Sequence, residues 1–497
     1  MEYRAAPLSS QPLCVNEIMK QEKKLFTTLV DPFRSGNGFD IGLVLVFLLI
    51  NGLVFVNACL HDPRIGYDTN GYLSYIQTLS KLRLVTPQDS HEFFSPPLPF
   101  AIPALLMAFT GMELAWAAKL AQFLNVFLSI GLTLYLIKAC QLLGSQSSLK
   151  LGALVFLGIL PVYYKTFAFI RGEPYVAFFT VIILYYTLLM SIRKQFTVAN
   201  NTILGVSMGL CALSRQWGIL LLPSVFLLFV FQWIRLPRWR QSITKTICLC
   251  LVLTTVISGW FYISLYSRYG SITAFNKKPA AHFSFSNQPL EFYVGLSPKL
   301  LFNKPVRPSF PNQFLPIFYS ELWGDYWCYF TVYGRDIRTS EYVDGYNLNQ
   351  ILSKGSRPYW LDTNYETIGA YLGRVNLIST FPSVLALISL VMVAMGILQR
   401  HSNNTLIARR REIYAFLLLA IGTTIVGYFW FLIMYPSIGE GDTIKATYLL
   451  HVFPFIAIMV GNFIEHLKKR SQFLYRLILG GLCFSFVHNI FAMLTHY

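Results

Sequence analysis

The sequence predicts an all-α integral membrane protein with about 11 transmembrane helices, its N-terminus in the cytoplasm and its C-terminus outside. Of its 497 residues, 55% are hydrophobic and only 13% are charged. Soluble globular proteins carry about a quarter charged residues, so this chain cannot cover a soluble surface with polar side chains. The apolar residues also come in blocks, and roughly 20 consecutive apolar residues cross the hydrocarbon core of a bilayer.

The apolar blocks set the order of the expected spans. The first block follows a polar segment that is too long for a cleavable signal peptide, so we expect an uncleaved first span. Residues 98–110 are apolar but short and contain two prolines, which predicts an interfacial or re-entrant helix. The spans are expected near residues 41–60, 115–137, 151–163, 174–192, 202–213, 217–234, 246–266, 371–399, 413–434, 446–464 and 473–494.

Two of the expected external segments are long, and they divide the chain into parts. The second long segment lies between spans seven and eight, and its Pro, Asn, Tyr and Trp content is typical of a folded, irregular cap. No internal repeat is visible, so an inverted-repeat transporter gains no support. The expected parts are a cytoplasmic N-terminal segment (1–40), a transmembrane core (41–266) with a first external loop (61–114), an external cap loop (267–370) and C-terminal transmembrane helices (371–497).

The distribution of charge orients the chain. With the N-terminus inside, the cytoplasmic segments hold 21 lysines and arginines, whereas the external loops other than the cap hold seven. This is the positive-inside asymmetry, and it explains much of the net charge of +17 without a nucleic-acid partner. Sixteen of the 23 acidic residues fall outside, which indicates that polar chemistry is concentrated on the external face.

The sequence contains few signs of metal or cofactor binding. Its eight cysteines lie mostly in or beside apolar runs and show neither a disulfide framework nor zinc-ligand spacing. No glycine-rich phosphate loop and no Ser-His-Asp arrangement is evident. We therefore expect no cofactor and assign no metal site; the alternative is a metal shared by Asp62 and Asp68, which are six positions apart.

Asp68 is the first candidate for chemistry. It comes shortly after the first expected span and opens a stretch, residues 71–81, whose aromatic and aliphatic spacing predicts a helix on the membrane surface. A partly buried carboxylate at this place can serve as a general base, because burial raises its pKa toward the working range. The alternative is that Asp68 only caps the helix N-terminus.

The layout of the first external loop resembles that of the GT-C glycosyltransferases, in particular the group of the protein O-mannosyltransferases and the lipid A aminoarabinose transferase. Many members have Asp-Glu after the first span and His-Pro-Pro-Leu later, where this chain has Tyr67-Asp68-Thr69 and Ser95-Pro96-Pro97-Leu98. The resemblance implies inverting transfer of a sugar from a polyprenyl-phosphate donor, with Asp68 deprotonating the acceptor. The second acidic position and the histidine are absent, and His91 or Glu92 could substitute for them.

A polyprenyl-phosphate donor needs cations held at the membrane interface. Arg171, Arg215 and Lys445 lie at the external ends of expected spans, in loops that are otherwise poor in cations. Arginine offers bidentate geometry to a phosphate, and lysine offers a point charge. The alternative is interfacial snorkelling, or a local ion pair such as one between Arg171 and Glu173.

The cap loop contains the aromatic and acidic segment Glu321-Leu-Trp-Gly-Asp-Tyr-Trp327. Its rings could stack on sugar rings while a carboxylate binds hydroxyls, or the segment could be a packed cluster that holds the cap together. The residues predicted to contact the substrate are Glu92, Glu173, Trp323, Asp325 and Tyr326.

These observations predict a membrane glycosyltransferase whose partners are the lipid bilayer, a polyprenyl-phosphate sugar and a lipid, glycan or protein acceptor. An O-antigen polymerase or ligase is the first alternative, and it would place its decisive cations in the cap, at Arg307, Arg335, Arg338 or Arg357. A lipid or sugar transporter is the second, and it would need ionisable residues near mid-membrane. The expected location is a bacterial inner membrane with a periplasmic site, or else an endoplasmic reticulum membrane with a lumenal site.

Overall fold

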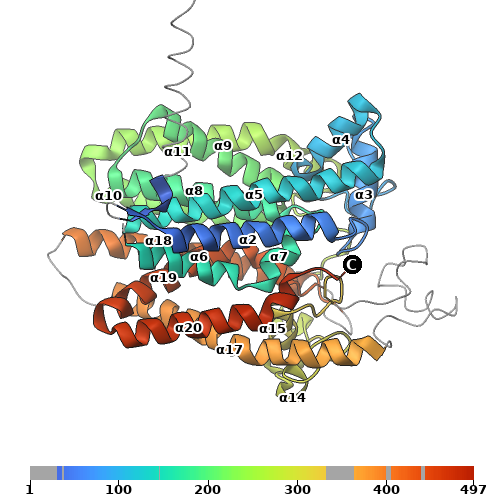
Figure 1. Ribbon diagram of the computed structural model, residues 1–497. Helices are drawn as coiled ribbons and strands as arrows, with labels where there is room; N and C mark the ends of the chain where they lie inside the picture. Colours follow the sequence, from blue (N-terminus) through green and yellow to red (C-terminus); the bar gives the residue numbers. More distant parts are fainter. Residues whose placement is uncertain are drawn as a thin grey trace, which may run out of the picture.

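The computed structural model describes residues 31–35, 38–144, 146–331, 363–398, 405–437 and 443–496, and its long helices run side by side in a bundle (Figure 1). Before the first long helix, the two-residue strands β1 (Arg34–Ser35) and β2 (Gly38–Phe39) pair antiparallel. Apart from this small hairpin and the 3-10 helix η1 (Asp31–Phe33) before it, the described fold is built of helices, as the composition predicts.

Nine helical stretches among the described residues are long and apolar enough to cross a membrane, or ten if one bent pair counts as a span. The sequence predicted about 11, and the difference arises at two places. Residues 151–163 fall on a pair of helices that bend by 63°. Residues 202–213 fall on a helix of only 17 residues. The nine stretches are α2 (Ile41–Leu60), α5 (Leu114–Leu143), α8 (Glu173–Arg193), η2 with α10 (Gln216–Arg235), η3 to α12 (Pro237–Tyr269), α17 (Thr363–Leu398), α18 (Thr405–Met434), η8 with α19 (Ala446–Arg470) and α20 with η9 (Gln472–Met493).

The bent pair consists of α6 (Ser147–Gly158) and α7 (Pro161–Ala168). Pro161 stands at the start of α7, where its missing N–H breaks the hydrogen-bond ladder of a continuous helix. The 17-residue helix is α9 (Val198–Ser214), which ends one residue before Arg215. Both irregular places therefore lie close to chain segments that carry candidate site residues.

The first external loop folds as the sequence predicts. It forms α3 (Thr69–Leu79) and α4 (Leu98–Thr110), which lie together at one end of the bundle, on the right in Figure 1. The described part of the cap forms short helices, while residues 332–362 of the cap, and residues 1–30 at the N-terminus, lie outside the described residues. The cap helices are η5 (Phe285–Asn287), α13 (Leu290–Val294), α14 (Pro298–Leu301) and α15 (Phe314–Trp323).

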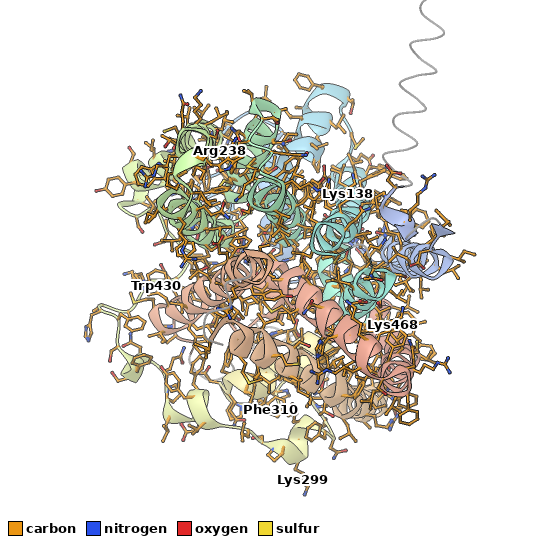
Figure 2. All side chains as sticks on the ribbon, turned by 90° about the vertical axis from the view of Figure 1, so that its left-hand side faces the viewer. Lys138, Arg238, Lys299, Phe310, Trp430 and Lys468 are labelled. Carbon is orange, nitrogen blue, oxygen red and sulfur yellow. The ribbon has the colours of Figure 1, made fainter. Side chains whose placement is uncertain are left out.

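The surface of the bundle has the character that a bilayer requires. Large apolar side chains on the long helices point outward; Leu45 is 61% exposed and Val256 is 69% exposed. Figure 2 looks along the bundle from the end opposite α3, where Lys138, Arg238 and Lys468 are labelled. These three cations belong to the segments predicted to be cytoplasmic; the same view also labels Lys299, which belongs to the cap.

Helix α19 is held against α6 by a contact that only glycine permits. A Cβ atom on Gly461 would lie 2.3 Å from the carbonyl oxygen of Leu149, and one on Gly152 would lie 3.2 Å from the Cα of Gly461. Small residues let helix backbones approach closely, which is how membrane helices gain van der Waals contact. Lys445 and η8 (Ala446–Val452) directly precede α19 in the chain.

We expect Gly461→Ala to destabilise the protein by on the order of 1–3 kcal/mol, because the added methyl group overlaps a backbone oxygen that cannot move independently. The matched control is Gly480→Ala in α20, where an added Cβ meets no atom within 4 Å. Thermal unfolding of the purified protein in one detergent measures both. Equal unfolding temperatures for the two variants would contradict this account of the contact between α6 and α19.

Candidate active site

Asp68 occupies the N-cap position of α3, yet its carboxylate does not cap the helix. The residue has a φ of 57° and a ψ of 19°, and its side chain makes no capping hydrogen bond. Instead, Oδ2 accepts a hydrogen bond of 3.0 Å from Nζ of Lys445. The capping interpretation therefore does not describe what this carboxylate does, and the left-handed backbone is one that non-glycine residues seldom adopt.

Lys445 reaches Asp68 from the C-terminal third of the chain, 377 residues away. It directly precedes η8 (Ala446–Val452), and its backbone N–H donates to the hydroxyl of Tyr428 at 2.9 Å. The lysine is buried, with 6% of its side chain exposed. Its position is thus set by α18 and η8 rather than by the external loop that carries Asp68.

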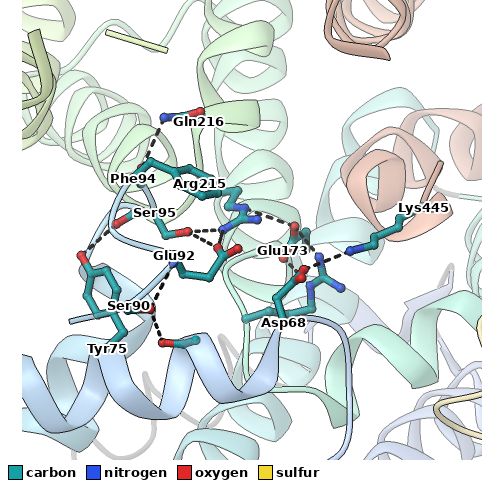
Figure 3. A network of polar contacts seen from close by, with 12 residues as sticks. Asp68, Tyr75, Ser90, Glu92, Phe94, Ser95, Glu173, Arg215, Gln216 and Lys445 are labelled. Carbon is teal, nitrogen blue, oxygen red and sulfur yellow. Dashed lines mark hydrogen bonds and ion pairs between the residues drawn. The ribbon is translucent and has the colours of Figure 1, made fainter. Parts of the chain in front are cut away.

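Arg215 and Glu173 lie beside this pair in a second network (Figure 3), and Arg171 joins the network through Glu173. Arg171 binds Glu173 through two nitrogens, with Nε 2.5 Å from Oε2 and Nη2 2.8 Å from Oε1. Arg215 stands between two carboxylates, with Nη1 3.1 Å from Oε2 of Glu92 and Nε 3.5 Å from Oε1 of Glu173. Nη1 of Arg215 also donates to the hydroxyl of Ser95.

The two arginines meet because their loops touch. Arg171 precedes α8, and Arg215 joins α9 to η2 (Gln216–Leu221). A Cβ atom on Gly172 would lie 2.3 Å from the carbonyl oxygen of Ser214, so only glycine lets the two loops approach. The structure thereby brings together six of the nine site residues that the sequence predicted.

A cavity of about 260 Å³ opens onto these residues. Arg171 and Glu173 do not line it directly; they lie behind Arg215 in the same network. The cavity is lined by Asp68, His91, Glu92, Arg215, Phe275, Asn276, Lys277, Thr443, Lys445 and Tyr448.

Two buried polar atoms next to this network have no hydrogen-bond partner among the described residues. They are Nη1 of Arg171 and the hydroxyl of Tyr72. The guanidinium of Arg171 lies 5.1 Å from the ring centre of Tyr67 and 5.6 Å from that of Tyr448. Buried polar groups in native proteins are nearly always satisfied, so these atoms indicate that a polar ligand belongs here.

The two cavity carboxyls have pKa values that shift in opposite directions. Burial favours the neutral form of Asp68, but the charge and hydrogen bond of Lys445 outweigh it and lower the pKa of Asp68 to about 2. Burial raises the pKa of Glu92 despite the charge of Arg215. The expectation that burial raises the pKa of Asp68 is therefore wrong, because the neighbouring Lys445 outweighs burial; the raised pKa belongs to Glu92.

Asp68, His91 and Glu92 form a group that could hold a metal ion, which the sequence analysis did not predict. Their ligand atoms lie within 4.8 Å of one another. The acidic members already have Lys445 and Arg215 as cationic partners, so an ion would share these oxygens with two positive charges. This group was not predicted from the sequence because 22 residues lie between Asp68 and His91.

The three predicted contacts in the cap lie elsewhere. Trp323 donates its indole N–H to Ser383 at 2.9 Å, and the hydroxyl of Tyr326 donates to the carbonyl of Phe310 at 3.0 Å. Asp325 accepts backbone N–H groups of residues 330 and 331, both at 2.7 Å. None of the three lines the Asp68 cavity, and their contacts are those of a packed cluster; a role for them in substrate binding stays a prediction.

Sequence reasoning missed a buried charge cluster beneath the site. Lys165 lies 2.6 Å from Oε1 of Glu321 and 3.7 Å from Oδ1 of Asp325, and all three side chains are completely buried. The hydroxyl of Tyr67 donates to the same oxygen of Glu321. A lysine followed by an apolar stretch, in Tyr164-Lys165-Thr166-Phe167, was the available signal.

The comparisons with known proteins concern the fold. No family model and no curated protein matches the chain. The apo oligosaccharyltransferase of Archaeoglobus fulgidus aligns at 12% identity with a TM-score of 0.50, over 91% of this chain and 56% of that one. ArnT from Cupriavidus metallidurans, solved with undecaprenyl phosphate, aligns at 14% identity with a TM-score of 0.36, over 85% of this chain and 77% of that one.

The first of these likenesses shows a shared fold: the chain and the archaeal oligosaccharyltransferase have a similar arrangement of helices. This chain aligns with 56% of the archaeal oligosaccharyltransferase. The shared fold therefore does not assign the activity of that whole enzyme to this chain.

We expect Arg215→Met to lower the free energy of unfolding by on the order of 3 kcal/mol, because it leaves Glu92 buried without its cation. The double variant Glu92→Gln with Arg215→Met should recover part of the loss, since a neutral amide replaces the unpaired charge. Thermal unfolding in detergent measures both.

The control for this measurement is Arg64→Met. Arg64 pairs with Asp62 at 2.7 Å, but 69% of its side chain is exposed, so little stability depends on the pair. If Arg215→Met unfolds at the wild-type temperature, or if Glu92→Gln fails to compensate, the network is not held together by these charges.

Proposed function

We propose that this protein is an inverting glycosyltransferase of the GT-C type, which moves a sugar from a polyprenyl-phosphate donor to an acceptor hydroxyl on the non-cytoplasmic face of the membrane. The observation that carries the proposal is the position of Asp68, whose carboxylate makes no capping hydrogen bond, pairs with the buried Lys445 and lines the cavity. The fold supports the same class.

In this reaction the acceptor oxygen attacks the anomeric carbon of the donor sugar. The bond between that carbon and the phosphate oxygen breaks, and the acceptor proton goes to the carboxylate of Asp68. The polyprenyl phosphate leaves with the additional negative charge. Lys445 and Arg215 line the cavity, and Arg171 lies behind Arg215, so these three cations can stabilise that charge as it develops.

The balance of charge in the cluster suits a single additional anion. Asp68, Glu92 and Glu173 face Arg171, Arg215 and Lys445, so the six groups are formally neutral when all are ionised. Lys277, which also lines the cavity, adds one positive charge to this balance. A phosphodiester carries one negative charge, so the donor can match the charge of the cavity.

The alternative functions have less support. A polymerase or ligase would place its decisive cations in the cap, where Arg335, Arg338 and Arg357 lie outside the described residues. Arg307 is described, and its guanidinium lies 5.3 Å from the ring centre of Trp327 and does not line the cavity. The proposed location remains a bacterial inner membrane, or alternatively an endoplasmic reticulum membrane; the sugar and the acceptor are not specified.

We expect Asp68→Asn to reduce sugar transfer by about 10²–10⁴-fold, the usual contribution of a general base, while the protein still folds. The measurement supplies membranes with a panel of radiolabelled polyprenyl-phosphate sugars and records the label transferred and the amount of folded protein. Asp62→Asn, in the same loop but outside the cavity, is the matched control and should transfer as the wild type does.

Two outcomes would count against the proposal. If the wild type consumes none of the donors, the class is wrong, and a polymerase or ligase becomes the function to test. If Asp68→Asn transfers as well as Asp62→Asn, the class can stand but Asp68 is not the base.

A further inference from the structure

Tyr67, the residue before Asp68, contacts charged groups with both its ring and its hydroxyl. Its ring centre lies 5.1 Å from the guanidinium carbon of Arg171 and 5.0 Å from Nζ of Lys445. Its hydroxyl donates to Oε1 of Glu321 in the cap. Only 3% of the residue is exposed, so these contacts are made away from water, where they are strongest.

The carboxylate that receives the Tyr67 hydroxyl is firmly placed. Glu321 pairs with Lys165 at 2.6 Å, and the same ammonium group donates to the carbonyl of Gly324 at 3.0 Å. Both charged side chains are fully buried. A buried ion pair is costly to separate, because each partner would be left as an unpaired charge in a medium of low polarity. Glu321 is therefore held in place, and its hydrogen bond with the Tyr67 hydroxyl positions Tyr67.

The backbone on both sides of Tyr67 has an uncommon conformation that neighbouring contacts must stabilise. Asp68 has a φ of 57°, and Gly66 before it has a φ of 148°, a region that favours glycine. An aspartate in the left-handed region persists only where its surroundings hold it. The ring of Tyr67 also packs edge-on against Phe169 and Tyr329, with ring centres 5.3 Å apart in each case.

We propose that Tyr67 is a positioning residue with two separable tasks, an inference that rests on the proposed function. Its hydroxyl, through Glu321 and Lys165, holds the backbone so that the Asp68 carboxylate faces the cavity. Its ring face holds the charges of Arg171 and Lys445 at the place where the donor phosphate binds. The cap thereby fixes the base and the phosphate-binding cations through one side chain.

The two tasks are separated by two substitutions. Tyr67→Phe removes the hydroxyl and keeps the ring, so we expect kcat for transfer to fall about tenfold or more, because small displacements of a catalytic group are costly. Its affinity for polyprenyl phosphate should stay within about twofold of the wild type, since both cation–ring contacts remain. Tyr67→Leu removes ring and hydroxyl together, so affinity should also fall roughly tenfold.

A further variant tests the hydrogen bond between Tyr67 and Glu321 by changing its acceptor. Glu321→Gln leaves Tyr67 intact but removes the charge that fixes it, and it should reproduce the lower kcat and unchanged affinity of Tyr67→Phe. The matched control is Tyr164→Phe, which also loses one buried tyrosine hydroxyl, here bound to the carbonyl of Gly158 at 2.6 Å. This control should keep both kcat and affinity. Thermal unfolding of every variant confirms that folded protein is compared.

The inference is overturned if folded Tyr67→Phe and Glu321→Gln both keep the wild-type kcat, or if Tyr67→Leu binds polyprenyl phosphate as tightly as the wild type. Wild type and Asp68→Asn in the same transfer assay report separately on the proposed function. If the wild type transfers no sugar, the function fails, and binding of polyprenyl phosphate to the Tyr67 variants still decides whether the ring holds the cations.

Discussion

The ion pair between Asp68 and Lys445 is the interaction on which the arrangement of the site depends. It joins the first external loop to the segment that begins η8, so the N-terminal and C-terminal parts of the bundle meet at one 3.0 Å contact. Around it, the hydrogen bond from the Lys445 N–H to the Tyr428 hydroxyl positions one partner, and the left-handed backbone at the N-cap of α3 positions the other. Each partner stabilises the other, because either residue alone would be an unpaired buried charge.

The carboxylates and cations of the site form a connected network of ion pairs rather than separate pairs. Arg215 links Glu92 to Glu173, and Glu173 holds Arg171 by two hydrogen bonds. Such a network keeps its charges ready in the absence of substrate, which is the condition for electrostatic stabilisation of a leaving phosphate without reorganisation. It also explains why short external loops of an otherwise apolar protein concentrate so many ionisable residues.

Much of this could be predicted from sequence, and the exceptions have physical reasons. The apolar block of α2 and the periodicity of α3 depend on local composition, and so both were predicted; the cations stood out because their loops hold few others. The break before Pro161 was not predicted, because the apolar block of 151–163 continues across it. The packing of Trp323, Asp325 and Tyr326 away from the Asp68 cavity could not be predicted, since composition does not tell whether an aromatic segment faces a cavity or packs inward; sugar binding by these residues stays a prediction. Tyr67 and Lys165 were missed because their partners, in the cap and across the site, are far away in sequence.

The most direct test of the central claim, that this network receives a lipid-linked phosphate, is the affinity of the purified protein for polyprenyl phosphate. We compare the wild type with Lys445→Gln and Arg171→Gln, and with Arg307→Gln as a cap cation outside the cavity. The account predicts at least tenfold weaker binding for the first two variants, about 1.4 kcal/mol each, and unchanged binding for the third. Unchanged affinity in both site variants, with all proteins folded, would contradict it.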